Sequence, residues 1–329
     1  MIEAAHLTKR FGPFAAISDV SFNVERGEIV GFLGPNGAGK STTMRILCGV
    51  FPPTTGRAVI AGYDVVADSL RARSVVGYFP ERVALYLDMT VWEYLRYVAE
   101  MKGVDPKQRR ADMDRALDSC GVTHVKHRLI GTLSKGYRQR VGIAQALVGQ
   151  PRVLILDEPT AGLDPEQVAE VRRLIRELRG ERTVILSTHI LPEVEATCDR
   201  VIIIHRGRIL AVDTPSNLNQ RLRQTSQIHL EVLGPEAAVI ARVRTIPGVM
   251  NVDPCPASPE LGVTALTVVT QKDRDLRAEL AAAITSAHWG LLELHPLTLS
   301  LEDIFLSLVT EPGPAATVVS HEVSRRLSA

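Results

Sequence analysis

The amino-acid sequence predicts an α/β protein with a mainly parallel sheet, followed by a second, smaller α+β domain. Continuously apolar, strand-sized segments such as "VLIL" and "VIIIH" alternate with helical segments, which is typical of parallel strands covered on both faces. A glycine-rich loop leads from one such strand directly into a helix. Beyond a break near residues 214–227, the apolar runs follow the order β-α-β-β-α-β, which indicates a ferredoxin-like domain.

The expected elements follow one another along the chain. Residues 1–31 alternate short apolar segments with turn residues and predict strands. Helical periodicity over about residues 85–150, with glycines just past the helix ends, predicts a helical insert in the α/β core. The core then resumes with strands in "PRVLILDEPT", "RTVILSTH" and "DRVIIIHRGRILAVD". We therefore expect domains at residues 1–220 and 226–311, the second closed by a helix in "SLEDIFLSLV", and a mobile tail at 312–329.

Composition excludes several classes of protein. Among 329 residues, 38 Lys and Arg nearly balance 37 Asp and Glu, so no nucleic-acid partner, which needs a basic face, is expected. No apolar run approaches the ~20 residues that span a bilayer, and "MIEAAHLTKR" lacks the apolar core of a signal peptide, so we expect a soluble, cytoplasmic chain. The cysteines lack CxxC pairing and are expected to be small buried residues rather than metal ligands; they are Cys48, Cys120, Cys198 and Cys255.

The segment "GPNGAGKST" has the spacing G-x-x-x-x-G-K-[ST] of a phosphate-binding loop. Its glycines allow backbone N–H groups to face a phosphate, and the following helix adds its positive end. Lys40 can reach the β- and γ-phosphates of a nucleotide, and the hydroxyl of Ser41 suits Mg²⁺. The nucleotide-binding residues expected here are Gly34, Pro35, Asn36, Gly37, Ala38, Gly39, Lys40, Ser41 and Thr42.

Two acidic residues follow the apolar strand in "VLILDEPT", at the edge of the sheet where ligands of open α/β folds bind. Asp157 suits the coordination shell of Mg²⁺, and Glu158 is a candidate to polarise an attacking water. Adjacent strand residues point to opposite faces, but the chain turns at the strand end and both can face the site. His189, which ends "VILSTH", is either a buried structural histidine or a contact of the γ-phosphate that holds the water and Glu158 in line.

Taken together, four motifs resemble the ATP-binding subunits of ABC transporters. "GPNGAGKST", "LSKGYRQR", "LILDEPTAGLDP" and "STH" occur in the order of that family's Walker A, signature, Walker B with D-loop, and H-loop motifs, over about residues 1–220. "GYFPERVALYLDMTV", "SKGYRQR" and "LTLSLEDIFLSL" are similar to exporter ATPases of the drug, antibiotic and gliding-motility type, which have an accessory C-terminal domain. The resemblance implies a P-loop NTPase (RecA-like) fold that hydrolyses ATP with Mg²⁺.

The same resemblance implies a second copy of the chain as partner. In this family two nucleotide domains pair head to tail, and the signature of each closes on the ATP held by the Walker A of the other. Ser134 and Gly136 would then donate to a γ-phosphate across the interface, and Asp164 would lie at the dimer seam. Phe11 matches the position where the family stacks an aromatic ring, usually Tyr, on adenine; the alternative is that Phe11 is a core residue.

Two positions depart from the family pattern. Glu81 replaces the glutamine usual between the core and the helical insert; it still suits Mg²⁺ but cannot donate a hydrogen bond. We therefore expect the metal preference or the coupling to the membrane partner to differ. Lys135, inside the signature, either adds positive charge near the phosphate or faces solvent.

The sequence predicts an ATPase that powers export through a separate transmembrane permease, bound peripherally at the cytoplasmic face of the membrane. The apolar segment around residues 83–97 is expected to form the groove for the permease, to pack in the core, or both. The alternatives are non-transport ABC ATPases. Those of repair or chromosome maintenance insert a long coiled coil, and those of translation carry two nucleotide domains per chain; neither feature is found in this sequence.

Overall fold

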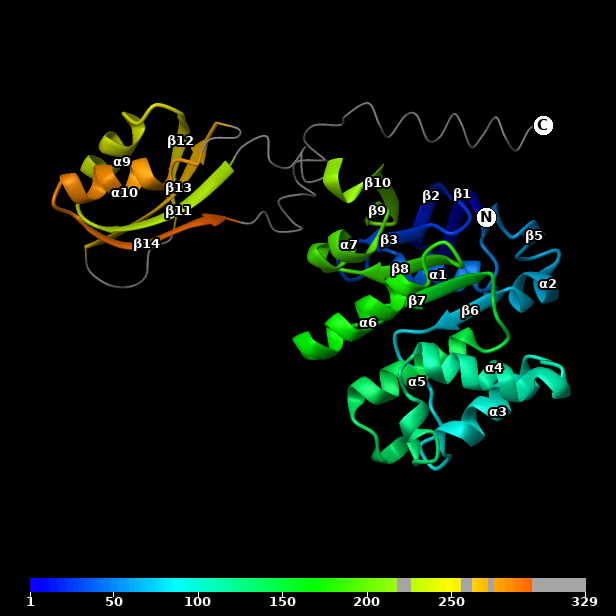
Figure 1. The fold of residues 1–329 in the computed structure, drawn as a ribbon. Helices are drawn as coiled ribbons and strands as arrows, with labels where there is room; N and C mark the ends of the chain where they lie inside the picture. Colours follow the sequence, from blue (N-terminus) through cyan, green and yellow to red (C-terminus); the bar gives the residue numbers. More distant parts are fainter. Residues whose placement is uncertain (218–225, 256–261, 272–274, 298–329) are drawn as a thin grey trace. The chain divides into compact units, whose positions relative to one another are not determined.

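The chain divides into two compact units at residues 215 and 216 (Figure 1), and each is described by itself. The computed structural model describes residues 1–217, 226–255, 262–271 and 275–297. The predicted closing helix in "SLEDIFLSLV" and the predicted tail at 312–329 lie outside the described residues. None of the helices within those ranges is long and apolar enough to cross a membrane.

The larger unit contains the predicted, mainly parallel sheet. Its strand order is β10-β9-β3-β8-β7-β6, and only β10 runs antiparallel to its neighbour. Every residue of β3, β7 and β8 is buried, which explains the apolar runs in these strands; the polar residues of β7 and β8 stand at the strand ends. The strands are β3 (Ile29–Leu33), β6 (Val76–Phe79), β7 (Val153–Asp157), β8 (Thr183–Thr188), β9 (Arg200–His205) and β10 (Arg208–Asp213).

The first strands of the chain form a separate antiparallel sheet with the order β2-β1-β4-β5. Its long strands alternate buried and exposed residues in part, because only one face packs on the rest of the unit. The rings of Phe22 on β2 and Phe32 on β3 lie 5.5 Å apart and belong to the core that joins the two sheets. The strands are β1 (Ile2–Phe11), β2 (Phe14–Val24), β4 (Thr55–Ile60) and β5 (Tyr63–Asp64).

Four helices of the larger unit, α3, α4, α5 and α6, begin at residues whose side chains cap them. In the helical insert, Thr90 and Glu93 form a capping box, Asp105 accepts from the N–H of Lys107, and Ser134 accepts from the N–H of Tyr137. The insert contains α3 (Val91–Met101), α4 (Pro106–Ser119) and α5 (Lys135–Leu147), at the place predicted for it. The remaining helices are α1 (Lys40–Leu47), α2 (Ser69–Ser74), α6 (Pro165–Glu177) and α7 (Leu191–Thr197).

The smaller unit follows the expected β-α-β-β-α-β order, with an antiparallel sheet of order β12-β13-β11-β14. Helices α9 and α10 cover one face of this sheet (Figure 1), and the core residues of the unit lie between them and the sheet. Alternate residues of the strands therefore form an opposite face without these helices. The elements are β11 (Ser226–Leu233), α9 (Glu236–Arg244), β12 (Val249–Pro254), β13 (Val263–Thr270), α10 (Arg277–Ser286) and β14 (Gly290–Leu297).

Three of the four cysteines are buried, as expected, but Cys255 is only partly buried. Burial raises the pKa of the Cys48 thiol, and the nearby Asp157 carboxylate raises it further. Burial likewise raises the pKa of Cys120 and of Cys198, so these thiols stay protonated. The expectation that all four cysteines are simply core residues is wrong for Cys255, which stands just beyond the end of edge strand β12.

We expect Phe32→Ala to lower the free energy of unfolding by about 3–5 kcal/mol, because it removes a fully buried ring from the core between two sheets. Urea unfolding followed by circular dichroism measures the change. Phe14→Ala is the matched control, since that ring is 64% exposed and its loss should change the value by no more than about 0.5 kcal/mol. Equal shifts in the two variants would contradict the assigned packing.

Candidate functional site

The glycine-rich loop connects β3 to α1 and requires glycine where its backbone turns into the helix. Gly39 has φ +107°, a left-handed conformation that side chains disfavour. A Cβ atom there would lie 2.7 Å from Cγ2 of Ile17 and 2.9 Å from the carbonyl oxygen of Ala16. The loop therefore packs closely against β2, and α1 begins at Lys40 with its first N–H groups available to a ligand.

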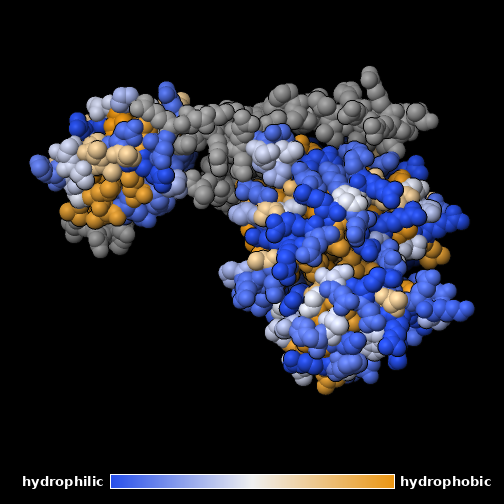
Figure 2. Space-filling view, viewed as in Figure 1, coloured by the Kyte–Doolittle hydropathy of each residue, from blue (hydrophilic) through white to orange (hydrophobic). Residues whose placement is uncertain are grey.

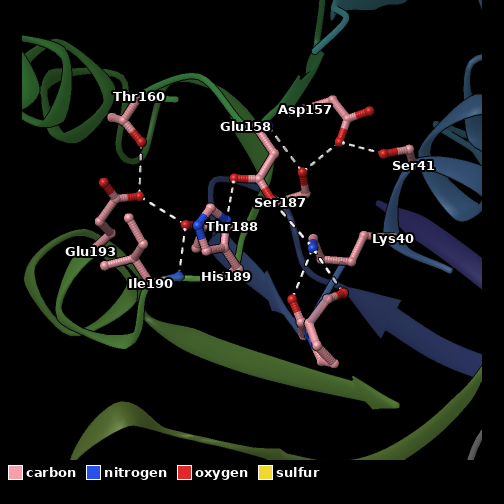
Figure 3. A network of polar contacts seen from close by, with 12 residues as sticks. Lys40, Ser41, Asp157, Glu158, Thr160, Ser187, Thr188, His189, Ile190 and Glu193 are labelled. Atoms are coloured by element: carbon pink, nitrogen blue, oxygen red, sulfur yellow. Dashed lines mark hydrogen bonds and ion pairs between the residues drawn. The ribbon is translucent and has the colours of Figure 1, made fainter. Parts of the chain in front are cut away.

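Lys40 is a buried cation surrounded by oxygen atoms. Its Nζ donates to the carbonyl oxygens of Gly34 at 2.8 Å and Pro35 at 3.2 Å, both in the same loop. Nζ also lies 3.2 Å from Oε1 of Glu158 (Figure 3). The side chains of Lys40 and Glu158 are only 6% and 10% exposed, so the two charges neutralise each other away from solvent.

Asp157 ends β7 and offers a carboxylate oxygen to a ligand. Its Oδ1 accepts from the hydroxyls of Ser41 at 3.1 Å and Ser187 at 2.5 Å. Its Oδ2 is buried and has no hydrogen-bond partner among the described residues. An unpaired buried carboxylate oxygen is costly, and carboxylate and hydroxyl oxygens are the donors that Mg²⁺ prefers. Ser41 and Asp157 therefore fit the Mg²⁺ that the sequence predicts.

Glu158 faces the same site as Asp157 because its backbone turns sharply. It has φ +52°, and its N–H donates to both the hydroxyl of Ser187 at 3.0 Å and the carbonyl oxygen of Ser187 at 3.2 Å. Nδ1 of His189 lies 3.0 Å from Oε2 of Glu158 (Figure 3). The His189 side chain is 45% exposed, so it is not the buried structural histidine of the alternative interpretation.

Glu193 on α7 is a buried residue of the site that the sequence analysis missed. Its Oε2 accepts hydrogen bonds of 2.8 Å from the hydroxyls of Thr160, which follows β7, and Thr188, which ends β8 (Figure 3). Its Oε1 lies 3.7 Å from Nη2 of Arg172 on α6. Glu193 thus links the loops that hold Glu158 and His189. In the sequence, the hints of this link are Thr160, close after Glu158, and Thr188, directly before His189.

The signature segment contacts the loop after β7 of its own chain. Nζ of Lys135 donates to the carbonyl oxygen of Gly162 at 2.9 Å while the residue stays exposed, which fits the solvent-facing one of the two orientations expected for this lysine. Oδ1 of Asp164 accepts from the N–H of Gln167 and caps α6. Gly136 is buried against the Gln167 side chain, which occupies the space that a Cβ would need.

Two further candidates lie at the surface. The Phe11 ring is 49% exposed and meets Phe51 edge to face at 5.6 Å, so Phe11 is not the core residue of the alternative interpretation. Glu81 is exposed, two residues beyond the end of β6. Because β6 pairs in parallel with β7, the residue lies at the same edge of the sheet as Asp157.

Comparison with known proteins assigns the chain to a family. The model of the ABC transporter family matches residues 17–161. The linearmycin resistance ATP-binding protein LnrL of Bacillus subtilis is 32% identical over 312 residues, which cover 94% of this chain and 98% of that protein. The chain belongs to the ABC transporter family. The bacitracin transport ATP-binding protein BcrA of Bacillus licheniformis is 39% identical to this ABC protein over 232 residues, 70% of this chain and 75% of that one.

Solved ABC structures agree with the fold. The cbiO1 protein of Clostridium perfringens, described as part of the ABC transporter complex cbiONQ, has a TM-score of 0.62 at 29% identity, covering 75% of this chain and 95% of that one. The dimeric structure of the bacterial ABC cassette MJ0796 has a TM-score of 0.60 at 25% identity, covering 65% and 99%. These similarities confirm the P-loop ABC fold, ATP binding and ATPase activity expected from the motifs.

We expect Glu193→Ala to lower the kcat of this ABC ATPase about tenfold, equivalent to about 1.4 kcal/mol, with a smaller change in KM for ATP. The change removes the common acceptor of the Thr160 and Thr188 hydroxyls, so the loops bearing Glu158 and His189 lose their link. Steady-state ATPase assays measure the effect. Glu195→Ala, on the exposed side of the same helix, should retain the wild-type kcat. Unchanged kcat in Glu193→Ala would contradict a positioning role.

Proposed function

We propose that this ABC ATPase powers export through a separate transmembrane permease, and that two copies of the chain close on ATP to do so. The observation that carries the proposal is the single polar network that joins Lys40, Asp157, Glu158 and His189 at one edge of the sheet. The names of relatives support the transport role, since one acts in linearmycin resistance and one in bacitracin transport.

Binding of ATP at the loop would rearrange the charges of this network. Among the described residues, the partners of Lys40 are the loop carbonyls and Glu158. A γ-phosphate carries more charge than the carboxylate and would replace Glu158 as the partner of Lys40. Glu158 would then be free to accept a proton from the water that attacks the phosphorus, with His189 holding its other oxygen. Nucleotide binding and preparation of the base are therefore one event.

Mg²⁺ would be held by Ser41 and Asp157, with Glu81 as the additional ligand from the end of β6. When bound, the ion supplies positive charge that offsets the phosphates. The buried, unpaired Oδ2 of Asp157 supports this assignment. Adenine would stack on Phe11, whose ring has an exposed face next to Phe51.

A second copy of the chain would complete the site. Ser134 is exposed at the start of α5, in the helical insert, whereas the phosphate loop precedes α1 in the sheet region (Figure 1). The hydrogen bond of Lys135 to Gly162 and the packing of Gly136 on Gln167 tie this signature to the segment after β7, so both would present one surface to a partner. ATP shared between two such surfaces would bind the closed dimer more tightly than the separate chains and would therefore favour the closed dimer. Hydrolysis would remove this difference in affinity.

The helical insert offers a surface for the permease. Hydrophilic residues cover most of the visible face of the larger unit in Figure 2. Residues 83–97 are the segment predicted to dock to the permease or to pack in the core. Within it Val91 and Tyr94 are buried, whereas Tyr86, Leu87 and Tyr97 are 48%, 52% and 39% exposed. The segment therefore packs in part in the core, and its exposed apolar side chains would suit a helix of the permease.

The alternative of a repair or chromosome-maintenance ATPase is disfavoured by the insert itself. Its three helices have 11, 14 and 13 residues and fold into a compact group, rather than extending as a long coiled coil.

Glu158→Gln should reduce ATP turnover by at least about 100-fold, because the amide cannot accept the proton of the attacking water. The variant should still bind ATP and accumulate as a nucleotide-bound dimer. Steady-state hydrolysis and size-exclusion chromatography with ATP measure both effects. Glu177→Gln, whose side chain is 65% exposed on α6, serves as the matched control. Normal turnover in Glu158→Gln would refute its assigned role.

A mixed dimer of Lys40→Ala and Ser134→Arg chains tests whether two copies share each site. Both defects fall in one composite site, and the other keeps an intact Walker A and signature, so the mixed dimer should hydrolyse ATP measurably. Each variant alone should be inactive, because both of its sites carry one defect. Two affinity tags isolate the mixed species for assay. If the mixed dimer were as inactive as the two single-variant dimers, the result would argue against a site that two chains share and that functions without the second site.

A further inference from the structure

The smaller unit contains a cluster of histidine and glutamate side chains that the nucleotide chemistry does not use. His229 and Glu231 lie on β11, and Glu293 and His295 lie on β14. The register pairs His229 with His295 and Glu231 with Glu293, directly across from one another. Their neighbours Ile228 and Leu230 belong to the core under the helices, so the cluster lies on the opposite face of the sheet.

The distances within the cluster are those of a group of metal ligands. Nε2 of His229 lies 3.3 Å from Oε1 of Glu231 and 4.0 Å from Oε2 of Glu293. One ligand atom from each of these three residues can be chosen so that all lie within 4.8 Å of one another. Two ligands on a tetrahedral Zn²⁺, with bonds near 2.1 Å, are about 3.4 Å apart. Only small side-chain rotations are needed to bring the three ligands to that spacing.

Two neighbouring carboxylates make the cluster suited to a cation. Two carboxylates face each other across neighbouring strands, which is destabilising by itself. The Nε2 atom of His229 can serve only one of them at a time, and the other partner of Glu293 is His295, whose Nδ1 lies 3.2 Å from its Oε1. The His229 and Glu231 side chains are 17% and 19% exposed and the Glu293 side chain is 52% exposed, so water screens this repulsion mainly from the Glu293 side. A divalent cation would balance two carboxylates and a neutral imidazole with no net charge remaining.

The surroundings orient the ligands as a second shell does in metal sites. Sγ of Cys255 lies 3.9 Å from Nδ1 of His229, on the far side of the ring from the carboxylates. A proton on Nδ1, donated toward this sulfur, leaves the lone pair of Nε2 for a metal. Nδ1 of His295 lies 3.2 Å from Oε1 of Glu293 and holds the second carboxylate.

We propose that the smaller unit binds one divalent transition-metal ion through His229 Nε2, Glu231 and Glu293, with Zn²⁺ as the representative ion. An imidazole ligand selects such ions over Mg²⁺ and Ca²⁺, which prefer oxygen donors alone. The ion joins β11 to β14, the edge strand of the sheet, and so stabilises this unit. The site is separate from the Mg²⁺ site at Asp157 and does not depend on the proposed transport function.

Zn²⁺ binding to the full-length, tag-free and nucleotide-free protein tests the proposal. A chromophoric chelator competes for Zn²⁺ in excess Mg²⁺, which occupies sites made of oxygen donors alone. The wild-type protein should bind one Zn²⁺. Glu293→Gln and His229→Gln should each bind Zn²⁺ at least about tenfold more weakly, because even the loss of a second-shell partner weakens metal binding by that much. His6→Gln removes an exposed histidine paired with a single carboxylate, Asp19, and should behave as wild type. Equal affinity in all four proteins would overturn the proposal.

Thermal unfolding of the smaller unit provides a second measurement. The chain has two tryptophans, and Trp289 packs against the core of this unit, so Trp92→Phe leaves a reporter specific to it. In that background Zn²⁺ should raise the midpoint of the Trp289 transition, as a ligand bound only by the folded state does. Mg²⁺ at the same concentration should not. Adding Glu293→Gln should abolish the rise. No Zn²⁺-dependent rise, or an equal rise in the Glu293→Gln protein, would overturn the proposal.

Discussion

The buried ion pair between Lys40 and Glu158 is the interaction on which the ATPase site depends. A buried cation is tolerated only where oxygens surround it, and here the loop carbonyls of Gly34 and Pro35 supply them. Those carbonyls point inward because the loop turns through left-handed glycine conformations between β3 and α1. The same pairing holds Glu158 beside the phosphate-binding loop. In the proposed function, binding of ATP and release of Glu158 as the base would thus be coupled through one ammonium group.

Much of this site was predictable because parallel strands bring residues distant in sequence to one edge. Lys40 follows β3, Asp157 ends β7 and His189 follows β8, and these strands are neighbours in the sheet. Apolar runs locate such strands, and their last residues locate the site. Glu193 escaped prediction because its role depends on two hydroxyls that reach it from different loops. Nothing in the spacing of a short helix such as α7 signals those contacts.

Other features depend on pairing that a single sequence does not reveal. The sequence predicted strands in residues 1–31. It did not predict that β1 and β2 join β4 and β5 in a separate sheet. The order of elements in the smaller unit was likewise predictable from alternating apolar runs. The cluster around His229 and Glu293 was not, because the two residues are brought together only by the register of β11 on β14. Register decides which side chains share a face, and a shift of one residue would separate them.

The left-handed backbone of Glu158 has a consequence for how this chain can evolve. A non-glycine residue in that conformation costs about 1–3 kcal/mol, which glycine would recover. A glycine here would also leave the buried ammonium of Lys40 without its carboxylate, which costs about 3–5 kcal/mol and outweighs the relief of the backbone. The strained turn is therefore retained because of the charge that its side chain neutralises.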